Sequence, residues 1–126
     1  MAYETKILTS NKEFTTREKI KILQMSDCVS LDTVIKSGDS VDVDVETFAI
    51  IDVHNDKAQN TDYKVCILID REGSKYKTGS ETFMDTMISL YTELKEANEL
   101  DEGFTLKCFK KPSKNFSGEF ITCTLA

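Results

Sequence analysis

The sequence predicts a mostly β, α+β domain with one main helix, and three observations carry this prediction. Runs rich in β-branched and aromatic residues lie on both sides of a single long amphipathic segment. The chain has 126 residues, 40% of them apolar and 30% charged, so it fits one soluble domain spanning residues 1–126. Only one proline and five glycines are present, which excludes linker-rich and collagen-like organisations.

The N-terminal part is predicted to combine an extended segment with a short helix. Residues 3–9 are compatible with an extended conformation. Thr15 and Glu18 have the spacing of a capping box in front of an apolar-periodic stretch, which predicts a helix near 16–25. Residues 28–40 fit either a short strand or a turn of helix, and the sequence leaves both open.

Three strands are expected to follow in succession. The segment 41–54 alternates strongly and is rich in β-branched residues, which is typical of a strand. A polar loop over 55–62 leads to the apolar run 63–70, which predicts a strand buried on both faces at its centre. A tight turn then returns the chain in a short strand, 75–78.

The main helix has the clearest signal in the chain. Thr78 and Glu81 again have capping-box spacing, and Ser80 offers a second N-cap hydroxyl. We expect the helix to end before the turn at 101–103. Its apolar stripe recurs at helical spacing and consists of Phe83, Met84, Met87, Ile88, Tyr91 and Leu94.

Two further strands, 104–111 and 119–125, are predicted to end the domain, joined by the loop 112–118. Three strands, a helix and two strands follow one another in the OB-fold, a five-stranded Greek-key barrel with its helix between strands 3 and 4. The sequence therefore favours an OB-fold-like barrel. An open α+β sheet with one packed helix would leave a similar pattern.

Charge is distributed unevenly along the chain. The formal net charge is −6, which argues against a protein that holds duplex DNA through overall positive charge. Residues 27–56 contain eight acidic residues and one basic residue, Lys36, whereas residues 104–118 contain four lysines and no acid. A smaller basic excess lies between Lys6 and Lys21. An acidic protein of this kind can still bind a polyanion at its basic strip.

The last two strands carry the candidate binding residues. If Phe104, Leu106 and Cys108 point inward together with Ile121, Cys123 and Leu125, the intervening side chains point outward. Aromatic rings on which bases stack, interleaved with lysines that follow the phosphates, are what single-stranded nucleic acid requires. The candidates are Tyr76, Lys77, Lys107, Phe109, Lys110, Lys111, Lys114, Phe116 and Phe120, with Lys75 as a further lysine. The alternative is that the rings complete the core and the lysines are simply solvated.

The sequence predicts no enzyme and no cofactor. No nucleophile elbow, glycine-rich phosphate loop or zinc motif is present, and His54 fits an ordinary residue at a strand end. The three carboxylates Asp42, Asp44 and Glu46 would share one face of a regular strand, so a Mg²⁺ or Ca²⁺ site stays an alternative. Four cysteines lack metal-ligand spacing and are expected to be buried free thiols in a reducing compartment: Cys28, Cys66, Cys108 and Cys123.

The runs YKTGSETFMDTMISLYTEL and KKPSKNFSGEFITCTL together resemble small single-stranded-DNA-binding proteins of phages that infect Gram-positive bacteria. The resemblance covers about residues 60–126. It implies a protein of the host cytoplasm that coats DNA during phage replication or recombination. The final residues, ITCTLA, depart from the acidic tail with which many such proteins recruit partners.

We therefore expect a sequence-nonspecific single-stranded-DNA-binding protein, with RNA as a further ligand to test. Replication proteins and further copies of the chain, as a homodimer or another homo-oligomer, are the protein partners considered, and no membrane association is expected. The main alternative is an acidic protein–protein interaction module that mimics nucleic acid or inhibits a nucleic-acid-binding protein.

Overall fold

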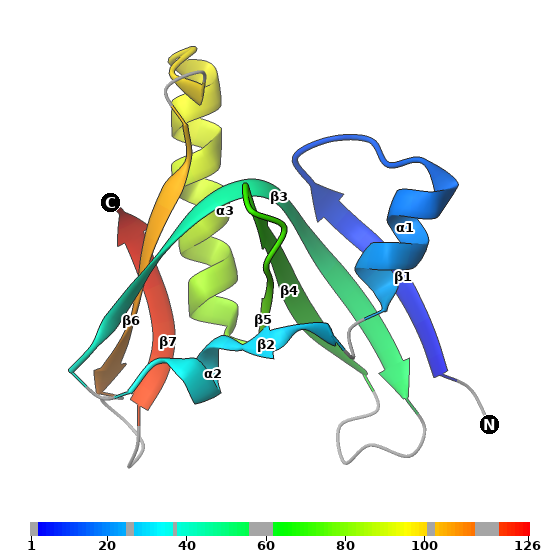
Figure 1. Cartoon of the computed structure of the whole chain (residues 1–126), viewed down its shortest axis with the longest axis horizontal. Coiled ribbons are helices and arrows are strands. Elements are labelled where there is room, and N and C mark those ends of the chain that lie inside the picture. Colours follow the sequence, from blue (N-terminus) through cyan, green and yellow to red (C-terminus); the bar gives the residue numbers. More distant parts are fainter. Residues whose placement is uncertain (1–2, 25–26, 37, 56–61, 101–102, 113–118) are drawn as a thin grey trace.

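One long strand, β3 (Ser40–Asn55), forms the centre of the fold. The computed structural model describes residues 3–24, 27–36, 38–55, 62–100, 103–112 and 119–126. Along one edge, β3 pairs with the antiparallel strand β4 (Asp62–Asp70). Along the other edge, its first half pairs with β6 (Thr105–Pro112) and its second half with β1 (Tyr3–Ser10). Figure 1 shows β3 arching across the molecule between these two partners.

The remaining strands extend the sheet on both sides. β5 (Lys75–Thr78) pairs with β4, and the two-residue strand β2 (Val29–Ser30) runs parallel to β5. β7 (Glu119–Leu125) pairs with β6. The register of β3 against β4 shifts between Val45 and Thr47, and such a bulge bends a strand. The sheet accordingly curls into a half-barrel (Figure 1).

Helices cover both faces of the curled sheet. α3 (Glu81–Glu96) packs against β7, and its Phe83, Met84 and Met87 enter the main core inside the curl. The short helix α2 (Leu31–Val34) contributes Leu31 to the same core. On the outer face, α1 (Thr16–Leu23) covers a second core, in which Ile22 joins five residues of β3 and β4: Ala49, Ile51, Val53, Val65 and Ile67.

The side chain of Asn11 fills the gap between β1 and β6 along the same edge of β3. Its Oδ1 accepts the amide hydrogen of Phe48 at 3.1 Å, and its Nδ2 donates to the carbonyl oxygen of Glu46 at 2.9 Å. One amide side chain thus replaces the backbone partner that neither strand supplies at this point. The backbone carbonyl of Glu46 and the backbone amide of Phe48 thereby gain hydrogen-bond partners, which buried or half-buried backbone polar groups need.

The predicted elements are confirmed where local sequence signals were strong. Helices begin at Thr16 and Glu81, and the capping box of Thr15 and Glu18 forms both of its hydrogen bonds. The ambiguous segment 28–40 contains both a strand and a helix, β2 and α2. The predicted loops 55–62 and 112–118 lie mostly outside the described residues.

The predicted count of five strands is wrong, because the residues that the structure describes already form a seven-stranded sheet. The extended segment at residues 3–9 joins the edge of β3 as β1, and β2 adds itself to β5. The main helix consequently lies between the fifth and sixth strands rather than between the third and fourth. The coarser prediction, a mostly β α+β domain with one main helix, is confirmed. Within the described residues, no helix is both long and apolar enough to cross a membrane.

Candidate nucleic-acid interface

The register of β6 and β7 places four of the predicted site residues on one face. Lys107 pairs with Thr124, Phe109 with Thr122, and Lys111 with Phe120. Directly opposite residues of an antiparallel pair point to the same side, so these side chains share the outer face of the sheet. We call Lys107, Phe109, Lys111 and Phe120 the aromatic–lysine face.

The residues that alternate with this face along β6 and β7 point into the core, so the aromatic–lysine face points outward. Phe104, Leu106 and Cys108 are at most 5% exposed and belong to the main core, as do Ile121 and Cys123. The predicted orientation of both strands is therefore confirmed for these residues. Leu125, also predicted to be buried, is 44% exposed because β7 ends there.

The two rings of the aromatic–lysine face are half-buried, and its two lysines are exposed. Phe109 and Phe120 are diagonal neighbours across the strand pair, an arrangement with Cα atoms about 7–8 Å apart. The Lys111 Nζ lies 6.0 Å from the centroid of the Phe109 ring, at the outer limit of a cation–π contact. A base can thus stack on a ring while its phosphate meets an ammonium group a few ångströms away.

Acidic residues of β3 border this face. Asp42 is the register partner of Lys107. Asp44 is engaged elsewhere, because its Oδ2 lies 3.2 Å from the Arg71 Nε and its Oδ1 accepts the Thr105 hydroxyl at 3.3 Å. Glu46 lies in the register shift, which breaks the regular alternation that would have aligned the three carboxylates. In the part of the chain that the structure describes, no three acidic, histidine or cysteine side chains form a group that could hold a metal ion.

Two of the other predicted lysines have structural partners. Lys110 donates to the carbonyl oxygen of Asp32 at 3.1 Å and so ties β6 to α2. Lys75 is used at the C-terminal end of α1, where its Nζ lies 2.6 Å from the carbonyl oxygen of Lys21 and 2.8 Å from the Asp27 Oδ1. Neither arrangement could be foreseen, since each joins residues far apart in the sequence.

The remaining candidates do not join the aromatic–lysine face. Tyr76 is half-buried and packs against the main core. Lys77 of β5 pairs with Ile67 of β4. In the sheet, β4 and β3 separate β5 from β6. Lys114 and Phe116 lie outside the described residues. The structure therefore assembles four of the nine predicted residues on one face.

The cysteines are free thiols, as the sequence predicted, and three of them are buried. Burial raises the pKa of Cys108 and Cys123 to about 12, and burial likewise raises the pKa of Cys66. Cys28 is half-buried, and the pKa of its thiol is raised for the same reason. Burial and the raised pKa keep Cys66, Cys108 and Cys123 protonated and unreactive near neutral pH, whereas the half-buried Cys28 stays partly accessible. At the other end of β3, the His54 Nδ1 lies 2.7 Å from the Asp62 Oδ1 across the β3–β4 pair.

Comparisons with protein-family models, with curated proteins and with solved structures found no match to this chain.

Proposed function

We propose that this protein binds single-stranded DNA without sequence preference and that the aromatic–lysine face is its contact surface. The observation that carries the proposal is the register of β6 and β7, which groups Phe109 and Phe120 with Lys107 and Lys111. Stacking of a base on an aromatic ring contributes about 1–3 kcal/mol and tolerates any base. The two exposed lysines supply phosphate contacts on this face of an overall acidic protein.

The arrangement of strands supports an OB-like scaffold for this activity. With β1 and β2 set aside, the chain runs through β3, β4, β5, α3, β6 and β7. The first of these strands pairs with the second and the fourth, the second with the third, and the fourth with the fifth. The OB-fold has the same order and pairings, and it is often partly open. Here β2 occupies the edge of β5 at which such a barrel would close.

The alternative, an acidic interaction module, has less support. Part of the negative charge of segment 27–56 is neutralised within the protein, by the ion pairs of Asp27 with Lys75 and of Asp44 with Arg71. A nucleic-acid mimic needs its carboxylates free to meet a basic partner. We extend the proposal to a role in phage DNA replication or recombination, in which replication proteins and further copies of the chain would be its partners.

A titration of fluorescent oligo-dT at two salt concentrations tests the proposal. Phe109→Leu and Phe120→Leu should each weaken binding about tenfold with the salt dependence unchanged, because stacking depends weakly on salt. Lys107→Gln and Lys111→Gln should each lower the salt slope by about 0.7, since each removes one phosphate contact. Lys36→Gln, the same charge change in an exposed residue of the acidic segment, is the matched control.

Two results would overturn this function. One is the absence of oligo-dT binding by the folded protein at low salt, which would move the interaction module ahead. The other is binding that none of the four substitutions changes, which would place the DNA on another surface. Oligo-rU in the same titration measures the preference between DNA and RNA.

A further inference from the structure

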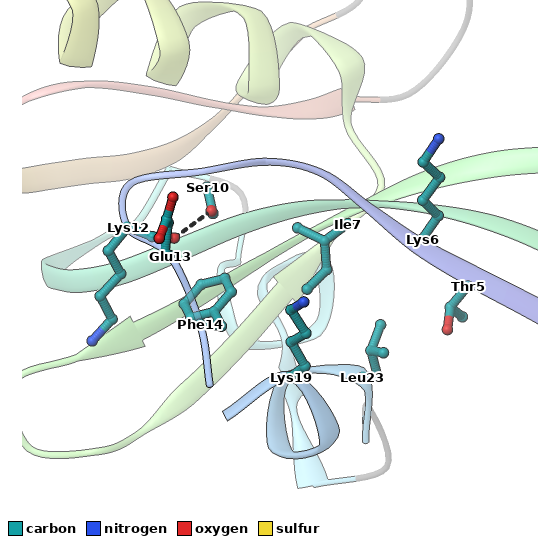
Figure 2. A pocket seen from close by; sticks show the side chains of 9 residues that line it. All are labelled: Thr5, Lys6, Ile7, Ser10, Lys12, Glu13, Phe14, Lys19 and Leu23. Atoms are coloured by element: carbon teal, nitrogen blue, oxygen red, sulfur yellow. Dashed lines mark hydrogen bonds between the residues drawn. The ribbon is translucent and has the colours of Figure 1, made fainter. Parts of the chain in front are cut away.

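A groove of about 580 Å³ lies between β1 and α1, away from the aromatic–lysine face. Its volume falls within the range of small-molecule sites. Ile7 of β1, Phe14 of the connecting segment and Leu23 of α1 form its apolar floor. All three are half-buried and pack with one side against the second core, so their other side faces the groove. Figure 2 shows these side chains around the opening.

A lysine ammonium group lies at the centre of the groove. In Figure 2 the Lys19 side chain extends from α1 toward β1, in the interval between Phe14 and Leu23. Lys6 and Lys12 also line the groove, and their side chains extend outward on opposite sides of it. Within the described residues, Lys19 forms no ion pair with an acidic side chain.

The charge of this region is opposite to that of the whole protein. Residues 5–23 contain five basic and two acidic residues, whereas the chain carries a net charge of −6. One of the two acids, Glu18, is already engaged, because its carboxylate accepts the Thr15 amide hydrogen at 3.0 Å and lies 3.6 Å from the Lys12 Nζ. The other, Glu13, lines the groove, whose lining therefore holds three lysines and one acid. The groove therefore favours an anionic ligand that also carries a flat apolar group.

We propose that this groove binds a nucleoside phosphate, with its base against Phe14 and its phosphate against Lys19. Lys6 is placed to meet a neighbouring phosphate when the nucleotide is a unit of a strand, and Lys12 would exchange its contact with Glu18 for a second one. The same chemistry is offered by a free nucleotide. This site lies beyond the proposed function and does not rest on it, since it shares no residue with the aromatic–lysine face.

The test uses the isotope-labelled full chain and follows its amide resonances by NMR during titration with dTMP. We expect shifts confined to residues around the groove, with weaker effects from thymidine or inorganic phosphate alone. Phe14→Leu keeps the apolar packing but removes the ring, and it should weaken dTMP binding about tenfold. Lys19→Gln should weaken it roughly threefold. Arg17→Gln, on the same helix but outside the groove, is the matched control and should bind like the parent.

Oligo-dT distinguishes the two sources of the nucleotide. A groove that serves a strand requires Phe14→Leu and Lys19→Gln to weaken oligo-dT as well as dTMP. A groove that serves a free nucleotide leaves oligo-dT unchanged while dTMP binding falls. Either pattern supports the proposal, even where the aromatic–lysine variants bind oligo-dT normally. The proposal is overturned if dTMP shifts no groove resonance, or if folded Phe14→Leu and Lys19→Gln bind both ligands like the parent.

Discussion

Lys75 should contribute to the stability of the fold rather than to ligand binding. Its Nζ lies within hydrogen-bond distance of the carbonyl oxygens of Lys21 and Gln24, at 2.6 and 3.3 Å, and of the Asp27 Oδ1 at 2.8 Å. The side chain is only 13% exposed. These bonds hold the C-terminal end of α1 against β5, and cations near the C-terminal end of a helix also interact favourably with its dipole.

The expected cost of Lys75→Met follows from these contacts. A hydrogen bond to a charged group contributes about 1.5–3 kcal/mol. The carbonyl oxygens of Lys21 and Gln24 can rebind water after the substitution, because both residues are exposed. The three bonds therefore do not add, and we expect a loss of about 2 kcal/mol in the free energy of unfolding. For a domain of this size that corresponds to a decrease of roughly 7 °C in Tm.

Urea unfolding followed by circular dichroism measures this change. The urea midpoint should fall at an unchanged m value, since the surface exposed on unfolding stays the same. Lys77→Met, on the same strand and the same face, is the control and should cost less than about 0.5 kcal/mol. The reasoning fails if Lys75→Met is as stable as the parent while its salt slope for oligo-dT falls, because Lys75 would then contact phosphate.

Three further predictions concern charge, thiols and pH. Asp42→Asn should leave oligo-dT affinity equal or slightly higher at low salt, because it removes a negative charge opposite Lys107; a large loss, or sensitivity to EDTA, would contradict this. In thiol labelling of the folded protein only Cys28 should react, and slowly, whereas the three buried thiols should react only after unfolding. The Thr15 hydrogen bonds hold the pKa of Glu18 below its ordinary value of 4.5 in the folded protein. Its stabilising contribution is therefore complete above that value and is lost as the pH falls through the lowered pKa, so urea midpoints of the parent should decrease more steeply with acid than those of Glu18→Gln.

Local signals in the sequence were sufficient for the elements and for the orientation of the last two strands. The capping box at Thr15 predicted the start of α1, and alternation placed Leu106 and Cys108 inward. These predictions succeed because the interacting residues are two to four positions apart.

Pairings between distant segments were not predictable in the same way. β1 pairs with residues of β3 that lie about forty to fifty positions later, and nothing in the two segments specifies that edge. The role of Lys75 depends on a helix that ends about fifty residues earlier, which no spacing in the sequence indicates. The alignment of Asp42, Asp44 and Glu46 failed for a local reason, because a bulge that alternation does not reveal interrupts β3.

The two proposed sites lie on the same outer face of the sheet, at opposite ends of β3. Val43 and Phe48 enter the main core inside the curl, whereas Asp42, opposite Lys107, faces outward. Ile51, opposite Ile7 at the groove, packs into the second core on that outer face. At about 3.3 Å per residue, the nine positions from Asp42 to Ile51 span at most roughly 30 Å. A strand that occupied both sites would therefore follow the convex side of the bend, and it would pass the carboxylate of Asp44, which Arg71 neutralises. The ion pair of Asp44 with Arg71 thus offsets one of the negative charges that a strand on this path would meet, and Asp42 beside Lys107 is another.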